Sequence, residues 1–277
     1  MFEPKTDEDY KYVKYAKTLI KIFTGMDKIV YCGLENLVTE GPNLISANHP
    51  DIGKGIGAII KLYLEEANRK TDFIARKEIF TQEEFKQLID TYAKRNIPRR
   101  MLQLALKPLQ LFLGSYIPRA VTTTGMIPLD INTQTIKATR YNLRVISNSI
   151  EPKLVDGKAI VLLQYSRNKT SSPWHYYLQR FHQTPARIAL QVFNHSGLAI
   201  PVTPISIYGG RGILPLKKIV VNVGKPLYIT DFMEEQNPIK AMADLLEKRT
   251  AQLLEESGLK DDPEKHRIDK RYMSKTN

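Results

Sequence analysis

Residues 43–53 of the chain read NLISANHPDIG, an apolar run that ends in a turn carrying a histidine. The run Asn43–Ser46 predicts a strand, and the turn residues at 50–53 predict a tight connection to a helix. Such a connection holds His49 at the rim of a sheet, where a neutral imidazole can accept a proton from a hydroxyl at physiological pH. The alternative is a histidine that merely caps a turn, so the rest of the chain has to separate the two interpretations.

Strand and helix patterns alternate on both sides of this stretch. Strands are predicted at residues 29–32, 43–46, 72–75, 126–129, 159–163, 200–207 and 218–223, and helices at 10–23, 51–67, 83–92, 135–150, 185–195 and 238–256. The strand at 159–163 is wholly apolar, which is typical of a parallel sheet covered on both faces. The sequence therefore predicts an α/β fold with a mixed, largely parallel sheet flanked by helices.

The composition limits the classes of protein to which the chain can belong. Its 277 residues are 42% hydrophobic and 25% charged, which is ordinary for a globular chain with a sizeable core. The single cysteine, Cys32, excludes an internal disulfide and a cysteine-based zinc cluster, and it fits a reducing compartment. The net charge of +12 predicts a negative partner, which is nucleic acid, an anionic membrane face or a phosphorylated substrate.

Residues 10–23 have the spacing of an amphipathic helix. One face carries Tyr12, Tyr15, Ala16, Leu19, Ile20 and Phe23, and the other carries Lys11, Lys14, Lys17 and Lys21. This pattern is equally compatible with a helix that lies in a membrane interface and with a surface helix packed on the core. The chain starts without the pattern of a signal peptide, and no apolar run approaches the ~18 residues of a membrane-spanning helix. We therefore expect any membrane contact to be at the surface.

The stretch 94–119 mixes basic residues with leucines and is broken by Pro98 and Pro108. Such a segment suits a monolayer of acidic lipid, with leucines entering and arginines at the level of the headgroups, although a buried helical pair with charged ends is the alternative. We accordingly divide the chain into an N-terminal amphipathic segment (1–28), an α/β domain (29–258) with a helical basic-apolar insertion (81–119), and a charged tail (259–277).

Short blocks along the chain follow a recognisable order. They read GLENL at 33–37, GP at 41–42, NH at 48–49, FIARKEIF at 73–80, GMIPLD at 125–130, GKAI at 157–160 before SR at 166–167, AIPVTP at 199–204 and VGKPL at 223–227. In this order and spacing they resemble the glycerolipid acyltransferase family, the PlsC-like enzymes that acylate glycerol-3-phosphate, lysophosphatidic acid and related alcohols. The resemblance extends over residues 25–255.

The resemblance implies a mechanism centred on His49. In the family, the histidine removes a proton from the acceptor hydroxyl, and the alkoxide attacks the thioester of acyl-CoA or acyl-carrier protein. A carboxylate a few residues later orients the imidazole, and arginines in later motifs hold the phosphate of the acceptor. Asp51 is the carboxylate nearest to His49 in the sequence, and Asp130, at the end of a predicted strand, is a second candidate.

The chain departs from the family pattern at several of these positions. The family has an aspartate five residues after its histidine, where this chain has Lys54, and an arginine after the aspartate of its second motif, where Ile131 follows Asp130. The third motif, usually FPEGTRS, is LLQYSRN at 162–168, so that Gln164 replaces the glutamate. The fourth motif, centred on residues 200–202, is intact. These differences leave open a divergent active enzyme and a retired one.

We therefore predict catalytic roles for His49 and Asp51, and contacts to substrate from Lys54, Arg76, Asp130, Gln164, Ser166 and Arg167. The implied co-substrate is acyl-CoA or acyl-carrier protein, with no further cofactor and no metal ligands. The implied partners are an anionic membrane surface and a phosphorylated glycerol or lysolipid acceptor, which places the protein in the cytoplasm on the inner face of a membrane. A second hypothesis is a lipid- or acyl-binding protein without catalysis. A third is a nucleic-acid-binding module, which is less favoured because no recognition motif accompanies the charge.

Overall fold

A computed structural model gives the structure of the protein. It describes residues 2–25, 27–48, 54–84, 87, 116–130, 136–164, 181–209 and 218–257, and for Arg76, Glu78 and residues 136–138 it describes the backbone alone. The basic-apolar stretch at 94–115, most of the predicted helix at 83–92 and the charged tail therefore lie outside the described residues.

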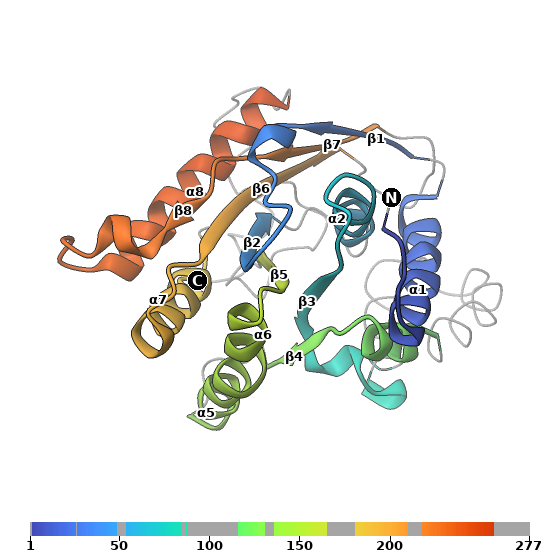
Figure 1. Cartoon of the computed structure of the whole chain (residues 1–277), viewed down its shortest axis with the longest axis horizontal. Helices are drawn as coiled ribbons and strands as arrows, with labels where there is room; N and C mark the ends of the chain where they lie inside the picture. The colour runs from blue at the N-terminus through green and yellow to red at the C-terminus, as the bar shows by residue number, and fades with distance from the viewer. Residues whose placement is uncertain are drawn as a thin grey trace, which may run out of the picture.

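One sheet of eight strands runs through the described part of the chain (Figure 1). The strands are β1 (Lys28–Cys32), β2 (Asn43–Asn48), β3 (Thr71–Arg76), β4 (Ile127–Leu129), β5 (Ala159–Gln164), β6 (Pro201–Gly209), β7 (Lys218–Val223) and β8 (Leu227–Tyr228). Their order is β1-β7-β6-β2-β5-β3-β4, with β8 paired to β6. The pairings of β6 with β7 and β8 are antiparallel and all others are parallel, which confirms the mixed, largely parallel sheet.

Helices cover both faces of the sheet (Figure 1). They are α1 (Asp7–Thr24), α2 (Lys54–Glu65), an unlabelled helix at 116–123, α5 (Ile136–Val145), α6 (Glu151–Val155), α7 (Thr184–Ser196) and α8 (Pro238–Glu256), with the short turns η1 (Leu34–Asn36), η2 (Lys77–Ile79) and η4 (Ile229–Phe232) and the π-helical η3 (Ile146–Ile150). One core cluster joins α1, α2 and the helix at 116–123 to the sheet, and the other joins η3, α6, α7 and α8 to it. Each predicted strand and helix in the described residues is thus confirmed as an element, although some of its predicted ends differ.

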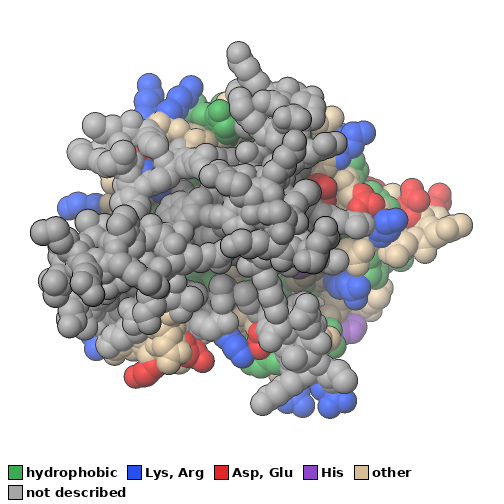
Figure 2. Space-filling model, turned by 180° about the vertical axis from the view of Figure 1, so that it is seen from behind, with side chains coloured by type: hydrophobic (Ala, Val, Ile, Leu, Met, Phe, Trp, Pro, Cys, Tyr) green, Lys and Arg blue, Asp and Glu red, His purple; other side chains and the backbone are tan. Residues whose placement is uncertain are grey.

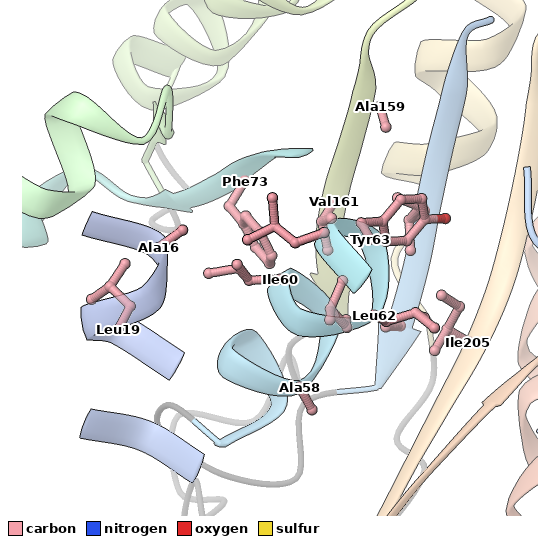
Figure 3. Close-up of a cluster of buried hydrophobic side chains, with 14 of the residues drawn as sticks. Ala16, Leu19, Ala58, Ile60, Leu62, Tyr63, Phe73, Ala159, Val161 and Ile205 are labelled. Carbon is pink, nitrogen blue, oxygen red and sulfur yellow. The ribbon is translucent and has the colours of Figure 1, made fainter. Parts of the chain in front are cut away.

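The apolar face of α1 packs against α2 and belongs to the first core cluster (Figure 3). Tyr12, Ala16 and Leu19 are buried there, and the hydroxyl of Tyr12 donates to the carbonyl of Thr71 and accepts from its amide. Burial raises the pKa of Tyr12 to about 12. The close approach of the two helices needs Gly57, because a Cβ at that position would lie 2.9 Å from Cγ2 of Thr24. Of the two interpretations of this helix, the structure supports packing on the core, with the lysine face outward.

On the other face of the sheet, α5, η3 and α6 follow one another without a break from Ile136 to Val155. The prediction that this helix ends at Ile150 was wrong, because the helical chain continues as α6 to Val155. Proline is tolerated in the first turn of a helix, and here the helix widens into a π-turn before Glu151 and restarts as α6 with Pro152 in that first turn.

The end of the basic-apolar stretch is described from residue 116. Ile117 is buried in the first core cluster, and the ring of Tyr116 lies 5.7 Å from that of Tyr15 on α1. This part of the stretch, at least, is used for packing. No helix among the described residues is long and apolar enough to cross a membrane.

Candidate functional site

The carboxyl ends of five parallel strands, β6, β2, β5, β3 and β4, meet at one edge of the sheet. Asn48, the last residue of β2, is in register with Gln164, the last residue of β5. On the other side of β5, the backbone of Arg76 ends β3 in register with Leu129 of β4, which is followed by Asp130. Ligands of open α/β sheets bind outside the carboxyl ends of the strands, so this edge is where a site is expected.

The structure brings part of the predicted site to this edge. Gln164, Asp130 and the backbone of Arg76 meet there beside Asn48, and Lys54 begins α2, the helix that follows β2 in the chain. The remaining four predicted residues, His49, Asp51, Ser166 and Arg167, lie outside the described residues. By sequence, His49 and Asp51 belong to the connection between Asn48 and Lys54, and Ser166 and Arg167 come shortly after Gln164.

Asn48 attaches the end of β2 to the neighbouring strand through its side chain. Its Oδ1 accepts a 2.7 Å hydrogen bond from the amide of Ile207, and its Nδ2 donates a 3.0 Å bond to the carbonyl of the same residue. The side chain is buried, and it pairs with β6 as a backbone amide would. The position from which the chain continues to His49 is therefore fixed by two buried hydrogen bonds.

Gln164 performs a similar task at the end of β5. Its Nε2 donates 2.9 Å to Oγ of Ser46 on β2, and its Oε1 accepts 3.0 Å from the backbone amide of His182. The residue is buried, so these bonds tie the start of α7 to the sheet. Gln164 thus has a structural role at this edge, because its side chain joins β5 to β2 and to the residue before α7.

Lys54 lies in an ion pair that the sequence did not reveal. Its Nζ is 2.5 Å from Oδ2 of Asp27, and the side chains are only 12% and 1% exposed. Asp27 comes from the connection between α1 and β1, far away in the sequence. At the position where the family that the sequence blocks resemble has an aspartate, this chain carries a cation whose charge is balanced by a carboxylate from another segment.

Asp130 is held by two other parts of the chain. Its carboxylate forms an ion pair with Lys77, which directly follows β3, and the distance from Oδ2 to Nζ is 2.7 Å. Its backbone amide donates to Oδ1 of Asn142 on α5, and its carbonyl accepts from Nδ2 of the same asparagine, at 2.9 and 2.7 Å. The side chain of Lys77 is 42% exposed, so a positive charge reaches solvent at this edge.

Sequence reasoning missed Asp27, Ser46 and Asn142 as members of this edge. No local pattern marks Asp27 or Asn142, since each acts on a residue from another segment. Ser46 carried a signal, because a serine in an otherwise apolar strand needs a partner when buried. Lys77 lies within the block at 73–80 that carries the family resemblance, although it was not singled out.

The arrangement combines an apolar sheet with a rim of amides, cations and a carboxylate. Lys77 brings a part-exposed positive charge to the rim beside Asp130, whereas Lys54 is paired with Asp27 and nearly buried. Such a rim can bind an anionic group by charge-assisted hydrogen bonds.

Among solved structures, the chain is similar to the crystal structure of the 1-acyl-sn-glycerophosphate (LPA) acyltransferase PlsC from Thermotoga maritima. The match has a TM-score of 0.51 and 18% sequence identity, and it covers 92% of this chain and 82% of that chain. This chain has the PlsC fold. The family resemblance inferred from the sequence blocks is thereby confirmed at the level of fold.

The PlsC fold is recognised here through structure rather than through sequence. No protein-family model matches the chain, and no curated protein matches it in sequence.

Proposed function

We propose that this protein is a membrane-peripheral acyltransferase. It moves an acyl chain from acyl-CoA or acyl-carrier protein to a hydroxyl of a glycerophosphate or lysophospholipid. The observation that carries the proposal is the PlsC fold together with the position of Asn48, which ends β2 at the carboxyl edge and directly precedes His49.

In the proposed reaction His49 is the general base. It takes the proton of the acceptor hydroxyl as the oxygen bonds to the thioester carbonyl carbon, the carbon–sulfur bond breaks, and the thiol leaves with a proton. Asp51 orients the imidazole and stabilises its protonated form. Lys54, Arg76 and Arg167 contact the phosphate of the acceptor or donor, and Asp130, Gln164 and Ser166 complete the substrate-binding rim.

The lysine face of α1 supports contact with an anionic membrane surface. Lys11, Lys14, Lys17 and Lys21 are exposed, and each basic residue near an anionic surface adds about 1 kcal/mol of attraction. Tyr10 is 62% exposed at the start of the helix. Because the apolar face of α1 is buried on α2, this contact would be electrostatic rather than by insertion of the helix. A position on the inner, more anionic face of a membrane follows from the same charge.

The second candidate function keeps the fold and omits the chemistry. Two observations favour a retired acyltransferase that binds a lipid or acyl chain. Lys54, at the position of the family's acid, forms an ion pair with Asp27. The side chain of Gln164 is hydrogen-bonded to Ser46 and to the amide of His182. Both replacements serve packing and hydrogen bonding in the described structure.

Release of free thiol separates the two candidates. The purified protein on anionic liposomes is given acyl-CoA or acyl-carrier protein, with glycerol-3-phosphate or lysophosphatidic acid as acceptor. We expect acceptor-dependent thiol release that falls about 10²–10⁴-fold in His49→Ala. The matched control is His195→Ala, which removes an exposed histidine of α7 that pairs with Glu151.

Full activity in His49→Ala would overturn the assignment of the base. Absence of thiol release with every donor, while the protein still binds lipid, would instead support the retired enzyme. Circular dichroism of both variants checks that the fold is retained.

A further inference from the structure

The outward face of α5 carries arginines and apolar side chains together. Arg140 and Arg144 are exposed, as are Tyr141 and Leu143, at 37% and 54%. Residues 136–150 contain no Asp or Glu. A single exposed leucine is ordinary, but a leucine and a tyrosine between arginines, on a helix without acids, form a surface suited to an acidic protein partner.

Contacts between neighbouring helices extend this surface to α7. Gln191 donates to Ser147 and to Glu151, and His195 pairs with Glu151 one turn further along both helices. The two helices therefore run side by side in the same direction. One turn before Gln191 is the exposed Arg187, and one turn before Ser147 is Arg144, so helical spacing brings these two arginines to the same end of the pair.

That end is also the carboxyl edge of the sheet. Asn142 on α5 bonds to the backbone of Asp130, and α7 begins just after His182, whose amide bonds to Gln164. The basic-apolar surface therefore adjoins the candidate site. Figure 2 shows Lys and Arg side chains at the lower right rim of the molecule, on the side of α5 after the 180° turn from Figure 1.

We propose that the α5 surface, defined as Arg140, Tyr141, Leu143, Arg144 and Arg187, docks a small acidic carrier protein that bears the acyl chain as a thioester. The proposal rests on the proposed acyltransferase function and selects the donor. Acyl-CoA needs contacts only where its own phosphates and acyl chain bind. A carrier protein also needs an outward surface of opposite charge beside the site, which steers its approach and fixes its orientation.

The surface is separate from the lysine face of α1. Helix α1 packs on α2 on one face of the sheet, whereas η3 and α6, which continue α5, pack on the other. A membrane contact through α1 and a carrier contact through α5 would therefore use different parts of the molecule.

A double charge reversal tests the proposal. Arg140→Glu with Arg144→Glu is compared with Lys248→Glu and Arg249→Glu, which makes the same change in charge on the exposed face of α8. Turnover is measured with a palmitoyl thioester of an acidic acyl-carrier protein and, separately, with palmitoyl-CoA. We expect the α5 variant to raise KM for the carrier thioester about tenfold or more and to leave kcat and KM for palmitoyl-CoA within about twofold. The α8 variant should change neither.

Binding of the carrier protein, followed by fluorescence anisotropy, tests the surface independently of turnover. If the wild type turns over no donor but binds the carrier, and the α5 variant has lost that binding, the proposed function fails and the docking surface is supported. Equal KM shifts for both donors, or carrier binding that survives the reversal or is absent from the wild type, would overturn the proposal. It would also be overturned if the variant lost binding to anionic vesicles alone, since the surface would then be a membrane contact. Thermal melting confirms that both variants are folded.

Discussion

The two ends of β2 each carry a buried asparagine, and each uses its side chain differently. At the amino end, Asn43 donates to the hydroxyl of Tyr63 and accepts from the hydroxyl of Thr203. At the carboxyl end, Asn48 bonds twice to the backbone of Ile207. The first asparagine joins side chains from α2 and β6 and closes the core. The second takes the place of a backbone pairing, so that the amide and the carbonyl of Ile207 both have a partner at the end of β2.

The same difference holds for the charges at the two edges. At the amino edge, Arg69 donates to the carbonyls of Val38, Gly41 and Gly157, and Asp72 pairs with the part-exposed Lys153. At the carboxyl side, Lys54 and Asp27 form a pair that is almost wholly buried. The amino edge thus joins loops at the surface, whereas the start of α2 relies on an ion pair shielded from water.

The largest effect is expected from breaking that shielded pair. Asp27→Asn leaves the ammonium of Lys54 buried without its carboxylate and should lower the free energy of unfolding by about 3 kcal/mol, measured by urea denaturation. Lys153→Met at the amino edge should cost about 1 kcal/mol or less, because that lysine is 36% exposed. Adding Lys54→Met to Asp27→Asn should restore part of the loss. Equal costs for the two single variants would remove the distinction between the edges.

The next effect separates the two asparagines by activity. Asn48→Ala should lower kcat/KM about 100-fold, equivalent to ~2.7 kcal/mol, because the residue before His49 loses its attachment to β6. Asn43→Ala, its matched control, should stay within about threefold of the wild type when both are assayed well below their melting temperatures. Each variant should lose a similar ~2–3 kcal/mol of stability, because each leaves two buried groups without a partner. A similar loss of activity in both would show that it reflects stability alone.

A smaller effect is expected from Asp72, and it depends on pH. Burial raises the pKa of this carboxyl, although Lys153 opposes the shift. Because the folded pKa lies above the unfolded one, the contribution of Asp72 to stability is present below the ordinary carboxyl pKa of about 3.9 and is lost as pH rises through the folded value. The stability of the wild type relative to Asp72→Asn should therefore fall as pH rises above the ordinary carboxyl pKa in urea titrations. A rising difference would contradict this sign.

The smallest effect at neutral pH is expected from Asp9, and its sign is opposite. The hydrogen bond from Lys70 and the backbone bonds of the capping box hold the pKa of Asp9 well below its ordinary range. Its contribution is therefore present above the ordinary carboxyl pKa and is lost as pH falls through the folded value. In the same titrations, the free energy of unfolding of Asp9→Asn should fall less steeply towards acid pH than that of the wild type. Parallel acid limbs would mean that the pair with Lys70 is screened by solvent.

Predictions from the sequence succeeded where a local pattern reports a local structure. The wholly apolar 159–163 became the buried β5, and the helix predicted at 238–256 is α8 with the same bounds. The end of the helix after Ile150 was mispredicted, because the chain continues through Pro152, which stands in the first turn of α6. Of the candidate site, the sequence placed Asp130 at the end of a strand, whereas it ended the other strands one or two residues too early and left Asn48, Arg76 and Gln164 outside them. The parallel pairing of these strands brings their ends to one edge.

By itself, the sequence determined the α/β class, the succession of strands and helices and the place of the histidine turn after β2, because periodicity and turn residues act over a few neighbouring positions. Only the tertiary structure decided that the apolar face of α1 packs against α2, that Asp27 balances the charge of Lys54, and that Gln164 bonds to Ser46 and His182. Each of these depends on which distant segments become neighbours. The partner of a buried charge or amide is chosen by proximity in the folded chain, and the residue type alone does not name it.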